Sequence, residues 1–387
     1  MRDVAIIGIG LTKFGERWDC GLKELMVEAG IAAIRDANLN SKDIEMIYGG
    51  TMASGRFVGQ EHTAALMADQ LGLHNIPAVR IENACASGGT ALREGFMAVA
   101  SGMHDIVAVG GVEKMTDVTS GEAATALGGA GDQEWELFQG ITFPGLYALI
   151  AKRHMHDYGT TEEQLAAVAV KNHHNATMNK YAQFNKEISV EEVMKSKVVA
   201  DPLKLLDCSP ISDGAAVVIL APLETAKKYN DTPIKISASA QASDTLRLAD
   251  RDSLVELKAT KIAAEKAFAM AKTSPSAIGA AEVHDCFTIA EILAMEDLGF
   301  YKKGTAAKAV EDGETAIGGK IAINTSGGLK GCGHPVGATG VKQAVEIVTQ
   351  LRGEAGGRQV EGIEKGLAHN VGGSGATAVV HIFERYN

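Results

Sequence analysis

The sequence predicts an α/β fold built from two similar halves, with a loop domain inserted into the first. Three observations predict it: short apolar runs alternate with helical patterns, a weak repeat returns in the second half, and a long stretch between the copies breaks the pattern. Strands that alternate with helices pair in parallel and carry helices on both faces. We expect the first half to span residues 1–225 and the second half residues 226–387.

The first half opens with an apolar run and then a helical pattern. Val4–Ile9 is expected to be a strand, and Leu22–Asp36 repeats apolar residues at helical spacing. The next elements are expected as strands Ile44–Gly50, Val79–Ile81 and Ile106–Gly110 and helices Ala64–Leu71 and Gly88–Ser101. Val217–Leu220 then returns the chain to this half as a strand.

The second half repeats this order. In both halves a helix, a polar turn and an isoleucine (Ile44 and Ile278) precede a strand. Later in each half a strand runs through an asparagine (Asn83 and Asn324) into a loop of small residues and a helix. Self-similarity of this kind indicates a duplicated structural unit.

The inserted segment covers about residues 115–205. It holds Trp135 and a histidine-rich helical stretch with residues 153–156 and the pair at 173–174. It is too long for a simple loop, so we expect a subdomain that covers the site.

The composition excludes several classes of protein. Hydrophobic residues make up 46% of the chain and charged residues 22%, which is typical of a globular core. A net charge of -11 disfavours binding to nucleic acid, and no apolar run is long enough for a membrane span. The five cysteines form no close pairs, and the first residues lack a signal-peptide pattern. Both observations favour a cytoplasmic protein with reduced thiols.

Cys85 is the candidate nucleophile. It lies in the segment NACASGG (83–89), between a predicted strand and a predicted helix. The N-terminus of a helix presents unpaired N–H groups and a positive dipole, which favour a thiolate and can hold an oxyanion. A buried structural cysteine is the alternative that this segment leaves open.

His334 is the candidate base. It lies in GGLKGCGHPVGATG (327–340), which precedes a helix and corresponds by the repeat to the loop of Cys85. Loops at matching strand ends can meet across a pseudo-twofold axis, and the imidazole could then take the thiol proton. A histidine that caps a turn is the alternative.

Two more segments come after strands of the second half. His284 and Cys286 belong to His-Asp-Cys at the end of a strand, where open α/β sheets place their sites. A coincidental polar strand end is the alternative. His369–Gly375 is rich in glycine, and its backbone N–H groups at Gly372 and Gly373 could complete an oxyanion hole.

Two other kinds of site are disfavoured. The run Gly8-Ile9-Gly10 does not complete a dinucleotide-binding loop, because Lys13 stands where the third glycine belongs. His284, Cys286, Cys332 and His334 could bind zinc, but their one-residue gaps are tighter than those of most structural zinc motifs. We therefore expect no metal.

Taken together, four segments resemble the thiolase family: NACASGG, VGGVEKMT (109–116), DCSPISDGAAVVIL (207–220) and GGLKGCGHPVGATG. The resemblance implies a five-layered α/β/α/β/α thiolase fold with no metal or organic prosthetic group. Where many thiolases have Asn-Glu-Ala-Phe, this chain has His-Asp-Cys-Phe, and the late cysteine is missing. This pattern is similar to sterol-carrier-protein-type thiolases and archaeal acetoacetyl-CoA thiolases.

The resemblance also implies roles for individual residues. Cys286 would be the second acid/base in place of the missing cysteine, and His284 would stabilise an enolate beside His334. His369 and Asn370 would be secondary site residues, and Ser209 would contact the pantetheine arm of coenzyme A.

The implied activity is the reversible condensation of two acetyl-CoA into acetoacetyl-CoA and free CoA, through an acyl-enzyme on Cys85. It would feed hydroxymethylglutaryl-CoA synthase in the mevalonate pathway. The resemblance further implies a homodimer or homotetramer, in a complex with that synthase and a small OB-fold zinc-ribbon protein. The alternatives are a 3-ketoacyl-CoA thiolase of fatty-acid breakdown, a non-catalytic scaffold subunit, and a condensing enzyme. A condensing enzyme that makes 3-hydroxy-3-methylglutaryl-CoA would want a glutamate as base, and neither the His284 nor the His334 motif has one. One that extends a carrier-bound acyl chain would need a basic docking patch, which the sequence does not show clearly.

Overall fold

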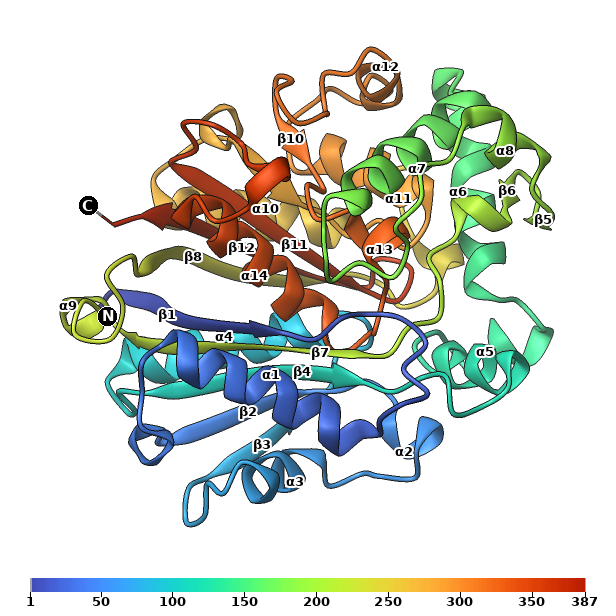
Figure 1. Ribbon diagram of the computed structural model, residues 1–387. Helices are drawn as coiled ribbons and strands as arrows, with labels where there is room; N and C mark the ends of the chain where they lie inside the picture. Colours follow the sequence, from blue (N-terminus) through green and yellow to red (C-terminus); the bar gives the residue numbers. More distant parts are fainter. Residues whose placement is uncertain (1, 387) are drawn as a thin grey trace.

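The computed structural model describes residues 2–386. Ten strands form one hydrogen-bonded sheet in the order β10-β9-β11-β12-β8-β1-β7-β4-β2-β3 (Figure 1). The first-half strands are β1 Val4–Leu11, β2 Met46–Gly50, β3 Ala78–Ile81, β4 Val107–Glu113 and β7 Gly214–Pro222. The second-half strands are β8 Ile234–Ser243, β9 Ala280–Glu282, β10 Ala322–Ile323, β11 Lys365–Gly372 and β12 Thr377–Arg385.

The strand order confirms the duplication. The first half is ordered β3-β2-β4-β7-β1 and the second half β10-β9-β11-β12-β8, so each strand has a counterpart in the same place. The two half-sheets join where β1 pairs antiparallel with β8.

The expectation of purely parallel pairing is wrong. β2 is parallel to β3 and β4, and β9 is parallel to β10 and β11. However, β7 is antiparallel to both its neighbours, and so is β12. The connections after β4 and β11 return the chain to the same end of the sheet from which they started. The next strand, β7 or β12, therefore runs in the opposite direction.

The helices and half-sheets make the five layers that the resemblance implied. Helices α4 (Ser87–Ser101) and α14 (Thr339–Arg352) pack between the half-sheets, in one apolar cluster with alternate residues of β1 and β7. Helices α1 (Leu22–Asp36) and α3 (Thr63–Gln70) cover the outer face of the first half-sheet. Helices α10 (Lys258–Ala271) and α11 (Thr288–Asp297) pack on the outer face of the second half-sheet.

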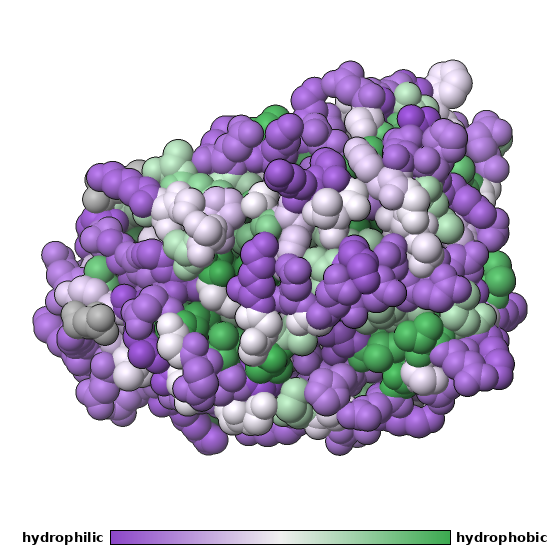
Figure 2. Space-filling model, turned by 90° about the horizontal axis from the view of Figure 1, so that it is seen from above, coloured by the Kyte–Doolittle hydropathy of each residue, from purple (hydrophilic) through white to green (hydrophobic). Residues whose placement is uncertain are grey.

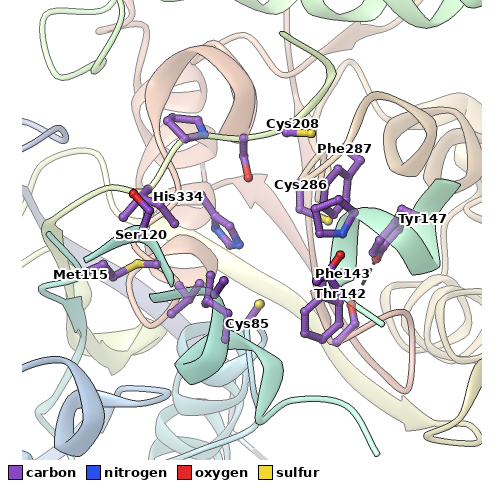
Figure 3. Close-up of a pocket in the computed structure, with 18 residues that line it drawn as sticks. Cys85, Met115, Ser120, Thr142, Phe143, Tyr147, Cys208, Cys286, Phe287 and His334 are labelled. Atoms are coloured by element: carbon purple, nitrogen blue, oxygen red, sulfur yellow. Dashed lines mark hydrogen bonds between the residues drawn. The ribbon is translucent and has the colours of Figure 1, made fainter. Parts of the chain in front are cut away.

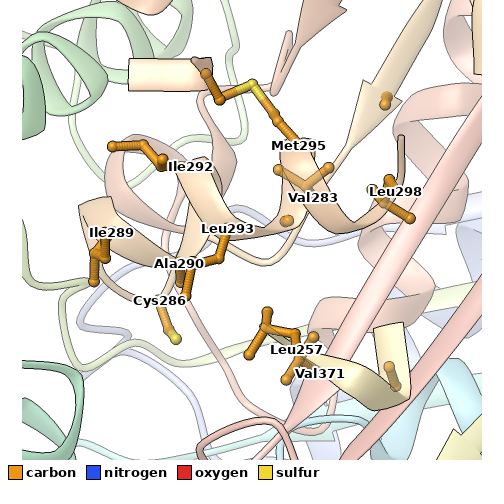
Figure 4. Packing of buried hydrophobic residues seen from close by; sticks show 14 of the residues in the cluster. Leu257, Val283, Cys286, Ile289, Ala290, Ile292, Leu293, Met295, Leu298 and Val371 are labelled. Atoms are coloured by element: carbon orange, nitrogen blue, oxygen red, sulfur yellow. The ribbon is translucent and has the colours of Figure 1, made fainter. Parts of the chain in front are cut away.

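Periodicity explains these layers. In β1, Val4 and Ile6 face the central helices while Ala5 and Ile7 face α1, because successive side chains of a strand point to opposite faces. Helix α1 occupies the predicted range and buries its apolar face. Helix α11 is buried along its whole length, and Figure 4 shows its apolar side chains around the backbone that carries Cys286.

The insertion runs from residue 114 to residue 213, between β4 and β7. It contains α5 Ser120–Gly128, α6 Phe143–Tyr158, α7 Glu162–Thr177, α8 Val190–Lys195 and the hairpin of β5 Val198–Ala200 with β6 Leu203–Lys204. Buried Asp213 ties its two ends together, accepting hydrogen bonds from Lys114 Nζ at 2.9 Å and from the N–H groups of Met115 at 2.6 Å and Thr116 at 3.0 Å. In Figure 1 its green helices lie beside one end of the sheet.

The remaining elements are short. They are α2 Ser54–Phe57, α9 Leu223–Ala226, α12 Ala306–Glu311, α13 Gly328–Cys332 and the 3-10 turns η1 Ser41–Asp43, η2 Leu137–Gln139, η3 Leu205–Asp207, η4 Leu248–Asp250, η5 Pro275–Ala277 and η6 Gly356–Arg358. Between residues 2 and 386, none of the helices combines the length and apolarity needed to cross a bilayer. Polar side chains cover most of the face seen in Figure 2, with apolar ones in small separate patches.

Candidate active site

A cavity opens where loops of both halves meet the insertion (Figure 3). Cys85 and His334 reach it from loops that precede the central helices, and Cys286 reaches it from the loop after β9. The other lining residues are Met115, Ser120, Ala124, Leu127, Thr142, Phe143, Pro144, Tyr147, Cys208, Ser209, Pro210, Ile211, Phe287, Val336 and Gly373.

Cys85 lies on a strained turn between β3 and α4. The residue before it, Ala84, has a φ of 51°, a left-handed conformation that costs free energy in a residue with a side chain and is typical of functional sites. Burial raises the pKa of the Cys85 thiol to about 12, and the backbone of Gly373 and of Cys85 itself acts in the opposite direction. The thiol therefore needs a base when it reacts.

The tautomer of His334 suits such a base. Its Nδ1 lies 2.7 Å from the hydroxyl of Thr339, and that hydroxyl donates its single proton to the carbonyl of Pro335 at 3.0 Å. The hydroxyl must then accept from His334 Nδ1–H, which leaves Nε2 as the unprotonated nitrogen. Burial lowers the pKa of His334 to about 3, so the ring is neutral at physiological pH.

His284 has the opposite tautomer. Asn370 Oδ1 accepts from the N–H of Gly89 at 3.1 Å, which fixes the orientation of the amide. Asn370 Nδ2 therefore donates, to the carbonyl of Cys85 at 3.0 Å and to His284 Nδ1 at 3.2 Å. The proton of His284 must be on Nε2, which is buried and has no hydrogen-bond partner within residues 2–386. Burial keeps the pKa of His284 well below its usual value, so the ring is a neutral donor.

The three groups lie close together. One ligand atom from each of Cys85, His284 and His334 lies within 4.8 Å of the other two. The imidazole rings meet edge to face, with centroids 5.1 Å apart and planes at 81°. A thiol thus faces one ring that can accept a proton and another that can donate a hydrogen bond.

The tautomer of His284 bears on whether a metal ion fits this arrangement. The lone pair of His284 is on Nδ1 and accepts from Asn370, and Nε2 carries the proton, so neither nitrogen offers a free lone pair. The four-residue zinc alternative is also disfavoured, because Cys332 is buried in α13 against Asn179 and does not line the cavity.

Cys286 is buried on another wall of the cavity, and its sulfur faces the same space as that of Cys85 in Figure 3. Burial and then the charge of a Cys85 thiolate raise the pKa of Cys286, and a hydrogen bond from Tyr147 lowers it. Sequence reasoning missed Tyr147, because it occupies an ordinary position in the helical pattern of the insertion.

Two glycines at the end of β11 lie against the loop of Cys85. A Cβ on Gly372 would stand 2.7 Å from the carbonyl of Asn83, so only glycine allows this approach. Gly373 has a φ of 62°, lines the cavity and places its backbone at the Cys85 thiol. The expected oxyanion-hole position is therefore next to Cys85.

The other expected residues differ in their placement. Ser209 lines the cavity, and its N–H donates to the carbonyl of Cys286 at 2.9 Å. Asn370 does not line the cavity, but it donates to His284 Nδ1 and so orients that ring. His369 points to the outer layer instead, with Nε2 2.8 Å from Thr260 Oγ1, because neighbouring residues of a strand face opposite sides.

Comparison with known proteins agrees with the fold and the motifs. Residues 4–224 match the family model "Thiolase, N-terminal domain" and residues 240–385 match "Thiolase C-terminal domain-like". The chain is 58% identical over 385 residues to acetyl-CoA acetyltransferase of Methanothermobacter thermautotrophicus, and the alignment covers 100% of both proteins.

Two further similarities are more distant. The chain is 35% identical over 392 residues to sterol carrier protein 2 of Gallus gallus, covering 98% of this chain and 71% of that protein. Among solved structures, the Ltp2-ChsH2(DUF35) aldolase superposes with a TM-score of 0.84 at 27% identity, covering 98% of this chain and 97% of the other.

Proposed function

Since this chain belongs to the thiolase family, we propose that it is an acetyl-CoA C-acetyltransferase that condenses two acetyl-CoA into acetoacetyl-CoA, reversibly, through an acetyl group on Cys85. The observation that carries the proposal is the opposite tautomers of His334 and His284 around one thiol. The 58% identity to a protein named for this activity supports the choice of substrate.

In the first half-reaction, His334 Nε2 takes the proton of Cys85, and the sulfur attacks the thioester carbonyl. The oxyanion would be held by the N–H groups of Cys85 and Gly373, which already face the sulfur. As the C–S bond of the substrate breaks, the departing CoA takes the proton of Cys286. The products are acetyl-Cys85, CoA as a thiol, a Cys286 thiolate and a protonated His334.

In the second half-reaction, the Cys286 thiolate removes an α-proton from another acetyl-CoA. The Nε2–H group of His284 and the protonated His334 stabilise the resulting enolate oxygen. The enolate carbon attacks the acetyl group, a C–C bond forms, and Cys85 leaves as a thiolate. That thiolate takes the proton from His334, while Cys286 keeps the α-proton as a thiol, so all groups return to their starting states.

The proposal includes a cellular setting. A cytoplasmic location is supported by the five cysteines, all of which are free thiols. Condensation of two acetyl-CoA is uphill, so we propose a downstream consumer, hydroxymethylglutaryl-CoA synthase of the mevalonate pathway, in a complex with a small OB-fold zinc-ribbon protein. A homodimer or homotetramer is also proposed, and the half-buried β3 at one edge of the sheet supports it.

The test is a thiolysis assay with 3-ketoacyl-CoA substrates of increasing chain length, together with release of CoA from acetyl-CoA. We expect acetoacetyl-CoA to be the preferred substrate and the intact protein to gain the mass of one acetyl group, which Cys85→Ala abolishes. A preference for long chains would indicate a thiolase of fatty-acid breakdown. Acetylation that persists in Cys85→Ala would reject the role of this cysteine, and no CoA release would favour a scaffold subunit.

A further inference from the structure

We propose that the hydroxyl of Tyr147 is a positioning group that stabilises the thiolate of Cys286, and so prepares this thiol to take the α-proton. The inference rests on the proposed function and adds to it a residue from the inserted loop domain. None of the motifs in the sequence includes Tyr147.

The position of Tyr147 is fixed from two sides. It comes from α6, is only 1% exposed and lines the same cavity as Cys286 (Figure 3). Its ring packs on Phe287, the residue after Cys286, with centroids 4.7 Å apart and planes at 32°. Its hydroxyl donates to the carbonyl of Gly373 at 3.2 Å. The tyrosine is thus held between the loop of the second thiol and the backbone that faces Cys85.

The direction of the hydrogen bond is set by the two acidities. Burial and then the neighbouring Cys286 raise the pKa of Tyr147 well above its usual value, while Tyr147 acts to lower the pKa of Cys286 against the effect of burial. The tyrosine is therefore the donor of the pair. The other group that lowers the pKa of Cys286 is the backbone of Phe287. Tyr147 is therefore a side chain that counteracts the burial of this thiol.

A hydroxyl has one proton, so the two bonds alternate. When Cys286 is a neutral thiol, Tyr147 donates to the carbonyl of Gly373. When CoA has taken the proton of Cys286, rotation about the C–O bond of Tyr147 can turn the same proton to the sulfur. No proton is transferred by Tyr147 and no bond to carbon is made.

The glycine turn has an independent anchor. Arg251 donates to the carbonyl of Ser374 at 2.7 Å and to its hydroxyl at 3.0 Å. Loss of the Tyr147 hydroxyl should therefore leave Gly373 in place, and its effect should be specific to Cys286.

The decisive experiment titrates Cys286 directly. In a Cys85→Ser background, the rate of alkylation of Cys286 by iodoacetamide is followed against pH by mass spectrometry of its peptide, because the thiolate is the form that reacts. We expect Tyr147→Phe to raise the apparent pKa of Cys286 by about one unit. At a fixed pH below that pKa, the variant would then hold ~10-fold less Cys286 thiolate. Tyr158→Phe is the matched control, because it removes a hydroxyl from the same helix at a site that is 40% exposed.

Kinetics supply the second measurement. Tyr147→Phe in the otherwise unchanged chain should lower kcat for condensation about 10-fold, with little change in KM, because the hydroxyl touches the base rather than the substrate. An unchanged titration of Cys286 would overturn the inference even if activity fell. A shifted titration in a chain without thiolase activity would sustain it and reject the proposed function instead.

Discussion

The two halves of the molecule repeat one set of strands but end them with different residues. At the end of β2 in the first half, Gly50 pairs with Gly111 of β4. At the equivalent place in the second half, just beyond β9, His284 lies beside Asn370 of β11. These two equivalent positions hold glycines in the first half. In the second half they hold an imidazole and the amide that orients it.

Packing explains why the first half has glycines there. A Cβ on Gly111 would lie 2.3 Å from the carbonyl of Gly337, and one on Gly50 would lie 2.9 Å from the carbonyl of Ser87. The His334 loop of the second half packs directly on these strand ends. The first half makes room for that loop and supplies Cys85, while the second half supplies both imidazoles and the thiol of Cys286. The comparison teaches that the two copies contribute different side chains to one site, and that close packing between the copies brings these side chains together.

The halves also differ in the connection that leaves β4 or its counterpart β11. After β4 the chain makes the insertion of residues 114–213, whereas after β11 only residues 373–376 lead to β12. The short turn places Gly373 against Cys85, and the long insertion lines the cavity with Tyr147 and Ser209. One connection supplies a backbone donor and the other supplies side chains.

The largest effect is expected when the thiol of Cys286, in the second half, is removed. Cys286→Ser should lower the rate of condensation by about 10³-fold, because a serine hydroxyl is a far weaker acid and cannot serve as the base. Thiolysis and condensation rates are the measurements. Cys208→Ser is the matched control: this thiol lines the same cavity but its Sγ lies 3.3 Å from the carbonyl of Lys204. Equal losses in the two variants would remove Cys286 from the mechanism.

The next largest effect is expected from a change that inverts the tautomer of His284. In Asn370→Asp, a carboxylate oxygen would accept from His284 Nδ1–H, so that the proton leaves Nε2 and the oxyanion loses a donor. We expect a loss of about 10²-fold or more in kcat, as is usual when one such donor is removed. The ¹⁵N chemical shifts of labelled His284 report the tautomer.

A double variant sharpens this prediction. If Asn370 acts through His284, then His284→Ala combined with Asn370→Asp should lose no more activity than His284→Ala alone. Additive losses would mean that Asn370 acts by another route.

Sequence reasoning succeeded where a local pattern carries the information. Helix α1 was predicted at its observed bounds because Leu22, Leu25 and Ala29 repeat on one face. The motifs around Cys85 and His334 were enough to predict that their loops meet, and the structure brings the Cys85 sulfur and a ring nitrogen of His334 within 4.8 Å of each other.

It failed where the information is in tertiary contacts. The antiparallel β7 depends on the path of the insertion, which no periodicity encodes. The side to which His369 points depends on the strand register, since one residue along β11 separates it from Asn370 in the site. Tyr147 could not be found, because only the packing of α6 against the second half brings it to Cys286.

The third prediction tests the packing between the halves. Gly111→Ala should lower the free energy of unfolding by about 2–3 kcal/mol, because the added methyl group meets backbone rather than a flexible side chain. Gly121→Ala is the control: it lies in α5, where an added Cβ meets nothing within 4 Å. That change should be neutral or stabilising by up to about 1 kcal/mol. Urea denaturation measures both, and comparable stability of the two variants would show that the strand ends tolerate side chains.

The smallest effect concerns a histidine at the junction of the halves. His381 of β12 is buried with Nε2 3.0 Å from the carbonyl of Gly89 in α4, while the equivalent position of β7 holds Val218, which cannot titrate. Burial lowers the pKa of His381 from its usual 6.5 to about 4. Its neutral form therefore contributes stability that is present above pH 6.5 and is lost as the pH falls towards 4.

Replacing His381 with glutamine keeps a donor for the Gly89 carbonyl and removes this titration. Below pH 6.5 the wild-type chain should lose up to about 1.4 kcal/mol per pH unit more than His381→Gln, the value for one proton. Burial raises the pKa of Glu113 and Asp285 to about 7, which acts in the opposite direction but equally in both chains. Urea denaturation at pH 6.5, 5.5 and 4.5 gives the difference. Parallel curves would mean that His381 titrates normally, and that the junction is open enough to admit a charged ring.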